Sequence, residues 1–96
     1  DDLGITPLHK ACSNSHESIV QYLVEHGANI NKGNNYGWTP LHFATGKNNL
    51  QILSYLLEHG ADINKENNRG LTALHCASDH GSVKEVKYLV ERGADI

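Results

Sequence analysis

The stretch GWTPLHFA at residues 37–44 decides the fold, because it recurs at a fixed distance on either side. Near-copies begin 33 residues earlier and 33 residues later, as GITPLHKA at 4–11 and GLTALHCA at 70–77. The same step links HGANI, HGADI and RGADI, which begin at residues 26, 59 and 92. A period that no insertion interrupts indicates one domain of stacked units. We therefore divide residues 1–96 into three copies, 1–33, 34–66 and an incomplete 67–96.

Each copy carries the signals that start a short helix. A threonine stands where its hydroxyl can cap the first amide groups, at Thr6, Thr39 and Thr72. Proline follows in two copies, at the first helical position, where a missing N–H costs nothing. A histidine at the third helical position can reach back to the threonine, as glutamate does in a capping box, at His9, His42 and His75. We expect these first helices to end near Ser15, Asn48 and Gly81.

A second helix follows in each copy and carries one apolar face. In copy one this stripe consists of Ile19, Val20, Leu23 and Val24, and Gly27 ends the helix. In copy three Glu85 stands at the position of Ile19. Because a helix pair of this length cannot bury its stripe alone, the copies must stack. The sequence therefore predicts an all-α solenoid, with repeating tyrosines that pack between the second helices at Tyr22, Tyr55 and Tyr88.

Composition excludes several classes of function. The net charge of −3 and the pI of about 6.1 give no basic surface for nucleic acid. No apolar run is long enough to span a membrane. Cys12 and Cys76 are too few for a disulfide scaffold and are expected to be small buried residues, so we predict an intracellular protein, cytoplasmic or nuclear.

The sequence also predicts neither a metal site nor catalysis. Equivalent histidines on successive copies should lie about 10 Å apart, because that is the spacing of packed helices. Zinc ligands must instead converge on one ion at about 2.0–2.3 Å. Neither a nucleophile motif nor a phosphate-binding loop is present. We therefore expect no cofactor and no enzymatic activity.

At the level of residues, the copies resemble ankyrin repeats over the whole chain. The resemblance rests on DLGITPLHKA, NYGWTPLHFA and NRGLTALHCA, each followed by HGANIN, HGADIN or RGADI. It departs at Ala73, which replaces proline, at Ser15 and Asn48, which replace glycine, and at Glu17 and Glu85, which replace apolar residues. The resemblance implies antiparallel helix pairs joined by hairpin-like fingers. It further implies a concave surface of fingers and first helices that binds another protein, without catalysis.

The candidate binding residues form two groups on that surface. Each finger carries one apolar residue between its glycine and its threonine, and these form a row with flanking neighbours: Ile5, Trp38 and Leu71, with Leu3, Tyr36 and Arg69. Tryptophan, tyrosine and arginine dominate binding hot spots, which favours partner contact. Alternatively, these side chains fold back and stiffen the fingers. By family analogy the first helices add Asn14, Lys47, Asp79 and His80, while Phe43 is either core or surface.

Two further expectations concern the asparagines and the ends. LVEHGANIN and LLEHGADIN resemble the segments that an asparaginyl hydroxylase modifies in ankyrin repeats, which makes Asn31 and Asn64 candidate acceptors. Alternatively, they bond the backbone of their own turns. We also expect the chain to be part of a longer array, because its end copies keep the internal pattern. Lys10, Glu17 and Glu85 should make the end copies more polar, although the isolated segment could still stack end to end. In that case it would serve as a passive spacer, if other copies bind the partner.

Overall fold

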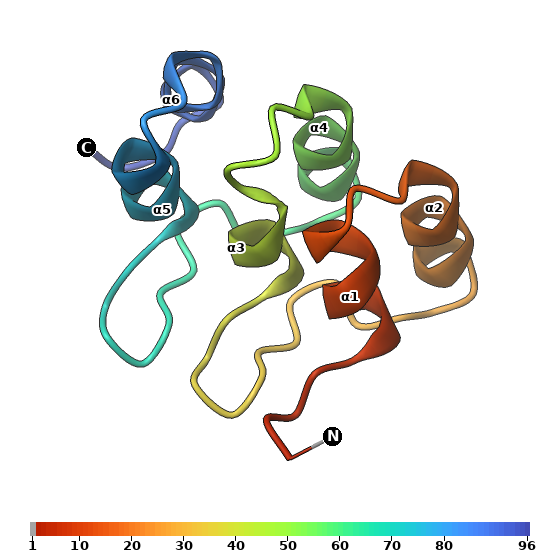
Figure 1. The fold of residues 1–96 in the computed structure, drawn as a ribbon. Helices are drawn as coiled ribbons and strands as arrows, with labels where there is room; N and C mark the ends of the chain where they lie inside the picture. The colour runs from red at the N-terminus through yellow and green to blue at the C-terminus, as the bar shows by residue number, and fades with distance from the viewer. Residues whose placement is uncertain (1) are drawn as a thin grey trace.

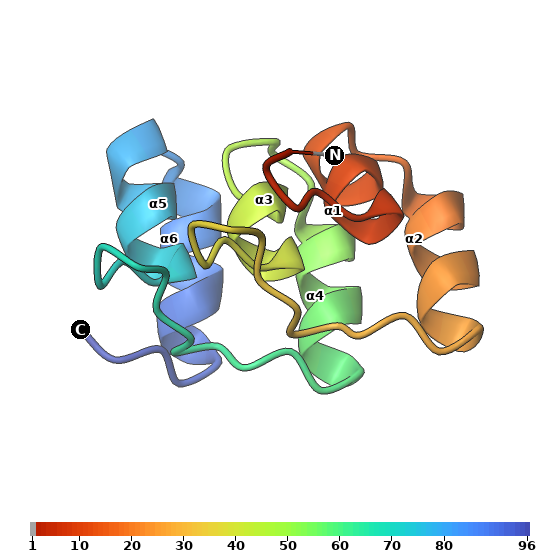
Figure 2. The same ribbon diagram turned by 90° about the horizontal axis from the view of Figure 1, so that it is seen from below.

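The fold is an all-α solenoid, as the sequence predicts. The computed structural model describes residues 2–96, so Asp1 lies outside the described residues. They form six helices and no strand: α1 (Pro7–Ser13), α2 (Glu17–Glu25), α3 (Pro40–Ala44), α4 (Leu50–Glu58), α5 (Ala73–His80) and α6 (Val83–Glu91). Figure 1 shows three antiparallel pairs side by side, with the loops that lead into α1, α3 and α5 projecting to one side. Figure 2 shows α2, α4 and α6 running alongside one another in a separate row.

All three predicted capping boxes are present. In copy two, the Thr39 hydroxyl accepts from the backbone N–H of His42 at 3.4 Å, and the Thr39 N–H donates to Nδ1 of His42 at 3.0 Å. Nε2 of His42 then lies 2.8 Å from the carbonyl oxygen of Leu71, in the next copy. Since Nδ1 is the acceptor, Nε2 carries the proton. The capping histidine therefore also joins two copies.

The apolar stripe forms one core that runs through the copies. Its largest fully buried members come from different copies and include Leu41, Ile52, Leu53, Leu56 and Leu89. Small residues on the inner helices, such as Ala44 and Ala77, are also buried and allow close helix packing. Cys12 and Cys76 are buried and free, as expected.

The fingers, residues 34–38 in copy two and 67–71 in copy three, are hairpin-like and bond to one another. Within finger two, the Asn34 N–H donates to the Trp38 carbonyl at 2.9 Å. Between fingers, the Asn68 N–H donates to the Tyr36 carbonyl at 2.9 Å. Gly37 permits this approach, because a Cβ there would lie 2.8 Å from the Asn68 nitrogen, and its φ of +81° is a left-handed conformation. The close stacking of fingers two and three sets the position of Trp38.

The first helix of copy two is shorter than predicted. Ser15 and Asn48 adopt left-handed conformations (φ 59° and 54°), as expected of residues that replace glycine, but α3 already ends at Ala44. Thr45 is extended, and its hydroxyl donates to the His42 carbonyl at 2.7 Å. The side chain therefore satisfies a carbonyl that further helical turns would otherwise occupy.

Glu85 does not make the end copy more polar, so that expectation was wrong. Its side chain is 0% exposed. Oε1 accepts from the Gly46 N–H at 2.7 Å, and Oε2 accepts from the Asn48 N–H at 3.1 Å. Glu85 thus holds the loop of copy two from α6 of copy three. A buried carboxylate is tolerated here because both of its oxygens accept hydrogen bonds.

Candidate protein-binding cleft

Half of the predicted binding residues surround one hollow between the fingers and α5. This finger–helix cleft has a volume of about 370 Å³ and is lined by Trp38, Arg69, Leu71, His75, Cys76, Asp79 and His80. Finger two contributes the tryptophan, finger three contributes Arg69 and Leu71, and α5 contributes the rest. The structure therefore brings together five of the ten predicted residues, namely Trp38, Arg69, Leu71, Asp79 and His80.

Trp38 is half-buried, so both interpretations of it hold in part. Its ring centroid lies 5.6 Å from that of His42 and 6.0 Å from that of Phe43. Its backbone N–H donates to Oδ1 of Asn34 at 3.0 Å, which fixes the finger. One side of the indole therefore packs on copy two, while the ring also lines the cleft. Phe43 is likewise half-buried and bridges toward His9, 5.0 Å away.

Charged and polar side chains form the rim of the cleft. Arg69, Asp79 and His80 are all exposed. The Arg69 guanidinium makes no hydrogen bond or ion pair with any other residue in 2–96. The His80 ring packs on the loop of copy two, where a Cβ on Gly46 would lie 2.6 Å from it. Arg69 thus offers a free planar donor group, whereas His80 is partly fixed.

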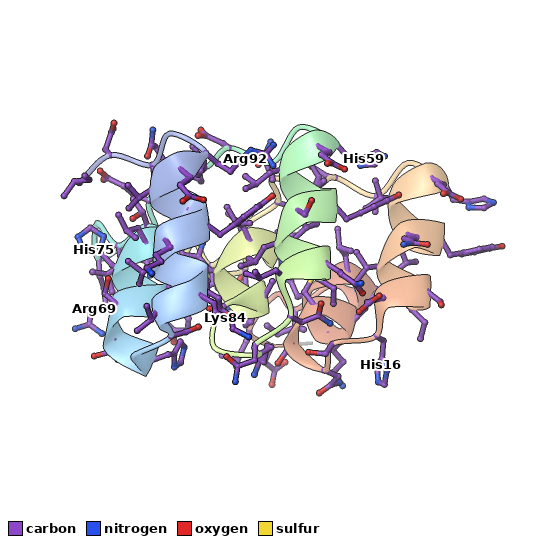
Figure 3. All side chains as sticks on the ribbon, turned by 90° about the horizontal axis from the view of Figure 1, so that it is seen from above. His16, His59, Arg69, His75, Lys84 and Arg92 are labelled. Carbon is purple, nitrogen blue, oxygen red and sulfur yellow. The ribbon has the colours of Figure 1, made fainter. Side chains whose placement is uncertain are left out.

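Two lining residues were not predicted as binding residues, because the sequence pattern assigns them structural roles. His75 caps α5 and is exposed; Figure 3 shows it on the same side of the molecule as Arg69. Cys76 forms part of the cleft wall. Burial raises the pKa of its thiol, and the charge of Asp79 raises it further, against a hydrogen bond with Thr45 that lowers it. The thiol therefore stays protonated and acts as an apolar wall rather than a nucleophile.

The other predicted binding residues lie outside the cleft. They are Leu3, Ile5 and Tyr36 on the fingers, and Asn14 and Lys47 beyond the ends of α1 and α3. Leu3 and Tyr36 are largely exposed, and their carbonyls accept from the next finger. These residues stay predictions as partner contacts.

Asn31 and Asn64 do not bond their own turns, as the simpler alternative supposed. Nδ2 of Asn31 donates to the Gly60 carbonyl at 3.1 Å, and its Oδ1 accepts from the Asp62 N–H at 2.8 Å. Oδ1 of Asn64 likewise accepts from the Asp95 N–H at 2.9 Å. Each asparagine therefore bonds the turn of the following copy. Hydroxylation at these positions stays a prediction.

The described residues offer no further reactive centre. Within residues 2–96, no group of three or more histidine, cysteine, aspartate or glutamate side chains could hold a metal ion. Burial raises the pKa of Cys12 to about 12. None of the helices in this part of the chain has the length and apolar character needed to cross a membrane.

Fold and cleft together define a helical repeat protein with a concave face between fingers and inner helices. A family model described as ankyrin repeats (3 copies) matches residues 1–67 and 47–96. The chain belongs to the ankyrin repeat family, whose members generally mediate protein–protein interaction and whose repeats are typically not catalytic. Among curated proteins, it is similar to the palmitoyltransferase AKR1 of Gibberella zeae, with 53% identity over 32 residues. That match covers 33% of this chain and 4% of the relative's length.

Proposed function

We propose that this chain is a protein-binding module whose finger–helix cleft takes an apolar side chain of its partner. The observation that carries the proposal is the gathering of Trp38, Leu71 and Arg69 around one hollow of about 370 Å³. That volume suits a side chain or a short peptide segment. Half-buried aromatic and aliphatic walls supply contact area, and the exposed guanidinium of Arg69 supplies directed hydrogen bonds. The proposal assigns the chain no catalysis and no cofactor, and an intracellular place of action, which its free buried cysteines support.

A peptide selection tests the cleft and does not require the natural partner to be identified first. Phage-displayed random peptides are selected on the wild-type chain, and the affinities of the selected peptides are then measured by calorimetry. Trp38→Ala should weaken binding about 30-fold or more, which corresponds to the hot-spot threshold of about 2 kcal/mol. Tyr22→Ala is the control, because it removes an exposed aromatic side chain from α2, outside the cleft.

The competing interpretation is a passive spacer. Its support is that Trp38 already packs on His42 and Phe43 within copy two. Circular dichroism of both variants should retain the helical signal, so that lost binding is not lost folding. If the selected peptides bind Trp38→Ala as tightly as the wild type, the cleft is not the recognition site and the spacer interpretation stands.

Hydroxylation of Asn31 and Asn64 is a separate proposal that rests on the leucine-to-asparagine spacing. Because the amide of Asn31 bonds Gly60 and Asp62, a hydroxylase would need to open the turn before it reached the side chain. Incubation with an ankyrin-directed asparaginyl hydroxylase, followed by peptide mass spectrometry, should show the addition of one oxygen atom. An unchanged mass beside a modified control repeat would refute the proposal.

A further inference from the structure

The first copy exposes residues whose counterparts in the later copies are covered. Ile19 on α2 is 50% exposed, whereas Ile52 at the same position of α4 is 2% exposed. Tyr22 is 62% exposed, while Tyr55 reaches back to α2 and donates its hydroxyl proton to the Gln21 carbonyl at 3.4 Å. The expected burial of Ile19 and Tyr22 was therefore wrong. Both side chains would need a preceding helix pair to cover them.

A hollow on the same flank continues this exposed surface. It has a volume of about 250 Å³ and is lined mainly by apolar groups, from Thr6, Pro7, Leu8, Leu23, Ala28, Asn29 and Lys32. Leu23 is half-buried there, whereas its counterparts Leu56 and Leu89 are both 0% exposed. Pro7 is exposed, whereas Pro40 is buried. The hollow therefore opens onto the end of the solenoid core.

The backbone of this flank repeats a hydrogen-bonding pattern that lacks its other half. Inside the chain, the amide of Asn31 bonds the Gly60 carbonyl and the Asp62 N–H. The equivalent groups of copy one are the Gly27 carbonyl and the Asn29 N–H. Among residues 2–96, neither group has a hydrogen-bond partner. The pair is thus placed as a donor and an acceptor for one further primary amide.

We infer that this flank, defined by Ile19, Tyr22, the hollow beside Leu23, and the free groups of Gly27 and Asn29, is a docking surface for another ankyrin-type helix pair. The occupant must carry an asparagine in the turn after its second helix, at the position that Asn31 holds in copy one. The argument is continuity with the two interfaces inside the chain, which use the same positions. A second copy of these 96 residues would offer Val83 and Val90 on α6, but no asparagine at that position.

The test extends the chain by one period, with a duplicate of residues 1–33 joined in frame before residue 1. Hydrogen exchange at the Asn29 amide should slow in the extended chain, on the order of tenfold beyond the change at Asp62, whose bond already exists. Tyr22→Ala should also shift the unfolding equilibrium about tenfold more in the extended chain than in the parent, because the ring is covered only there. The matched control is an added repeat whose turn asparagine is replaced by alanine, which should leave Asn29 exchange as in the parent.

Three outcomes would overturn the inference. Equal costs of Tyr22→Ala in the two chains, together with unchanged Asn29 exchange, would mean that the flank does not receive a repeat. Protection of Asn29 that persists in the alanine control would mean that the amide bridge is not what recognises the occupant. Self-association of the parent chain at micromolar concentration, abolished by Tyr22→Glu, would assign the flank to a second copy instead.

Discussion

Replacing Glu85 with alanine should destabilise the chain far more than any exposed charge change. The substitution removes two charge-assisted hydrogen bonds, of 2.7 Å to the Gly46 N–H and 3.1 Å to the Asn48 N–H. Bonds to charged groups contribute about 1.5–3 kcal/mol each. Gly46 and Asn48 are exposed residues, so water can partly replace the carboxylate, and we reduce the sum to about 2–4 kcal/mol. A domain of this size has a total stability of about 5–15 kcal/mol, so the loss should be plain.

The measurement is urea unfolding followed by circular dichroism, with Glu91→Ala as the control. Glu91 is an exposed carboxylate at the end of the same helix and should change stability by less than about 0.5 kcal/mol. Glu85→Ile, which restores the residue of copies one and two, should recover part of the packing but neither hydrogen bond. If Glu85→Ala unfolds at the same urea concentration as Glu91→Ala, the carboxylate does not hold the loop of copy two.

Three further predictions concern the contacts between copies. Burial lowers the folded-state pKa of His42, against a hydrogen bond with Leu71 that raises it, so the unfolded chain binds this proton more readily; stability should be full above about pH 6.5 and fall as the pH drops below it, and His42→Gln should show a shallower fall in urea titrations at several pH values. Gly37→Ala should lower the melting temperature more than Gly70→Ala, since both have left-handed φ but only at Gly37 would the new Cβ meet a neighbouring finger; equal shifts would contradict this. Asn31→Ala should cost about 1–3 kcal/mol in the same unfolding assay because it removes two hydrogen bonds, while the exposed Asn14→Ala should be neutral, and a neutral Asn31→Ala would refute the bridge.

Local chemistry made much of this fold predictable. A capping box needs only a threonine and a histidine three residues apart, so its geometry is written into each copy. The period adds the number of copies and their stacking order, because a stripe such as that of α4 cannot be buried by one helix pair. Trp38 and Leu71 could therefore be placed near each other before their contacts were known. The cysteines could also be assigned to the interior, since their spacing excludes a disulfide.

Only the tertiary structure decided which equivalent positions behave differently. Ile19 and Ile52 have the same place in the period, yet one is exposed and the other buried, because a copy precedes only the second. Glu85 reads as a surface charge in sequence, but it faces two loop amides from a neighbouring copy. Asn31 likewise bonds a turn 29–31 residues further along the chain. A repeat specifies the residue at each position, whereas the neighbouring copy supplies the atoms that bury it or bond to it.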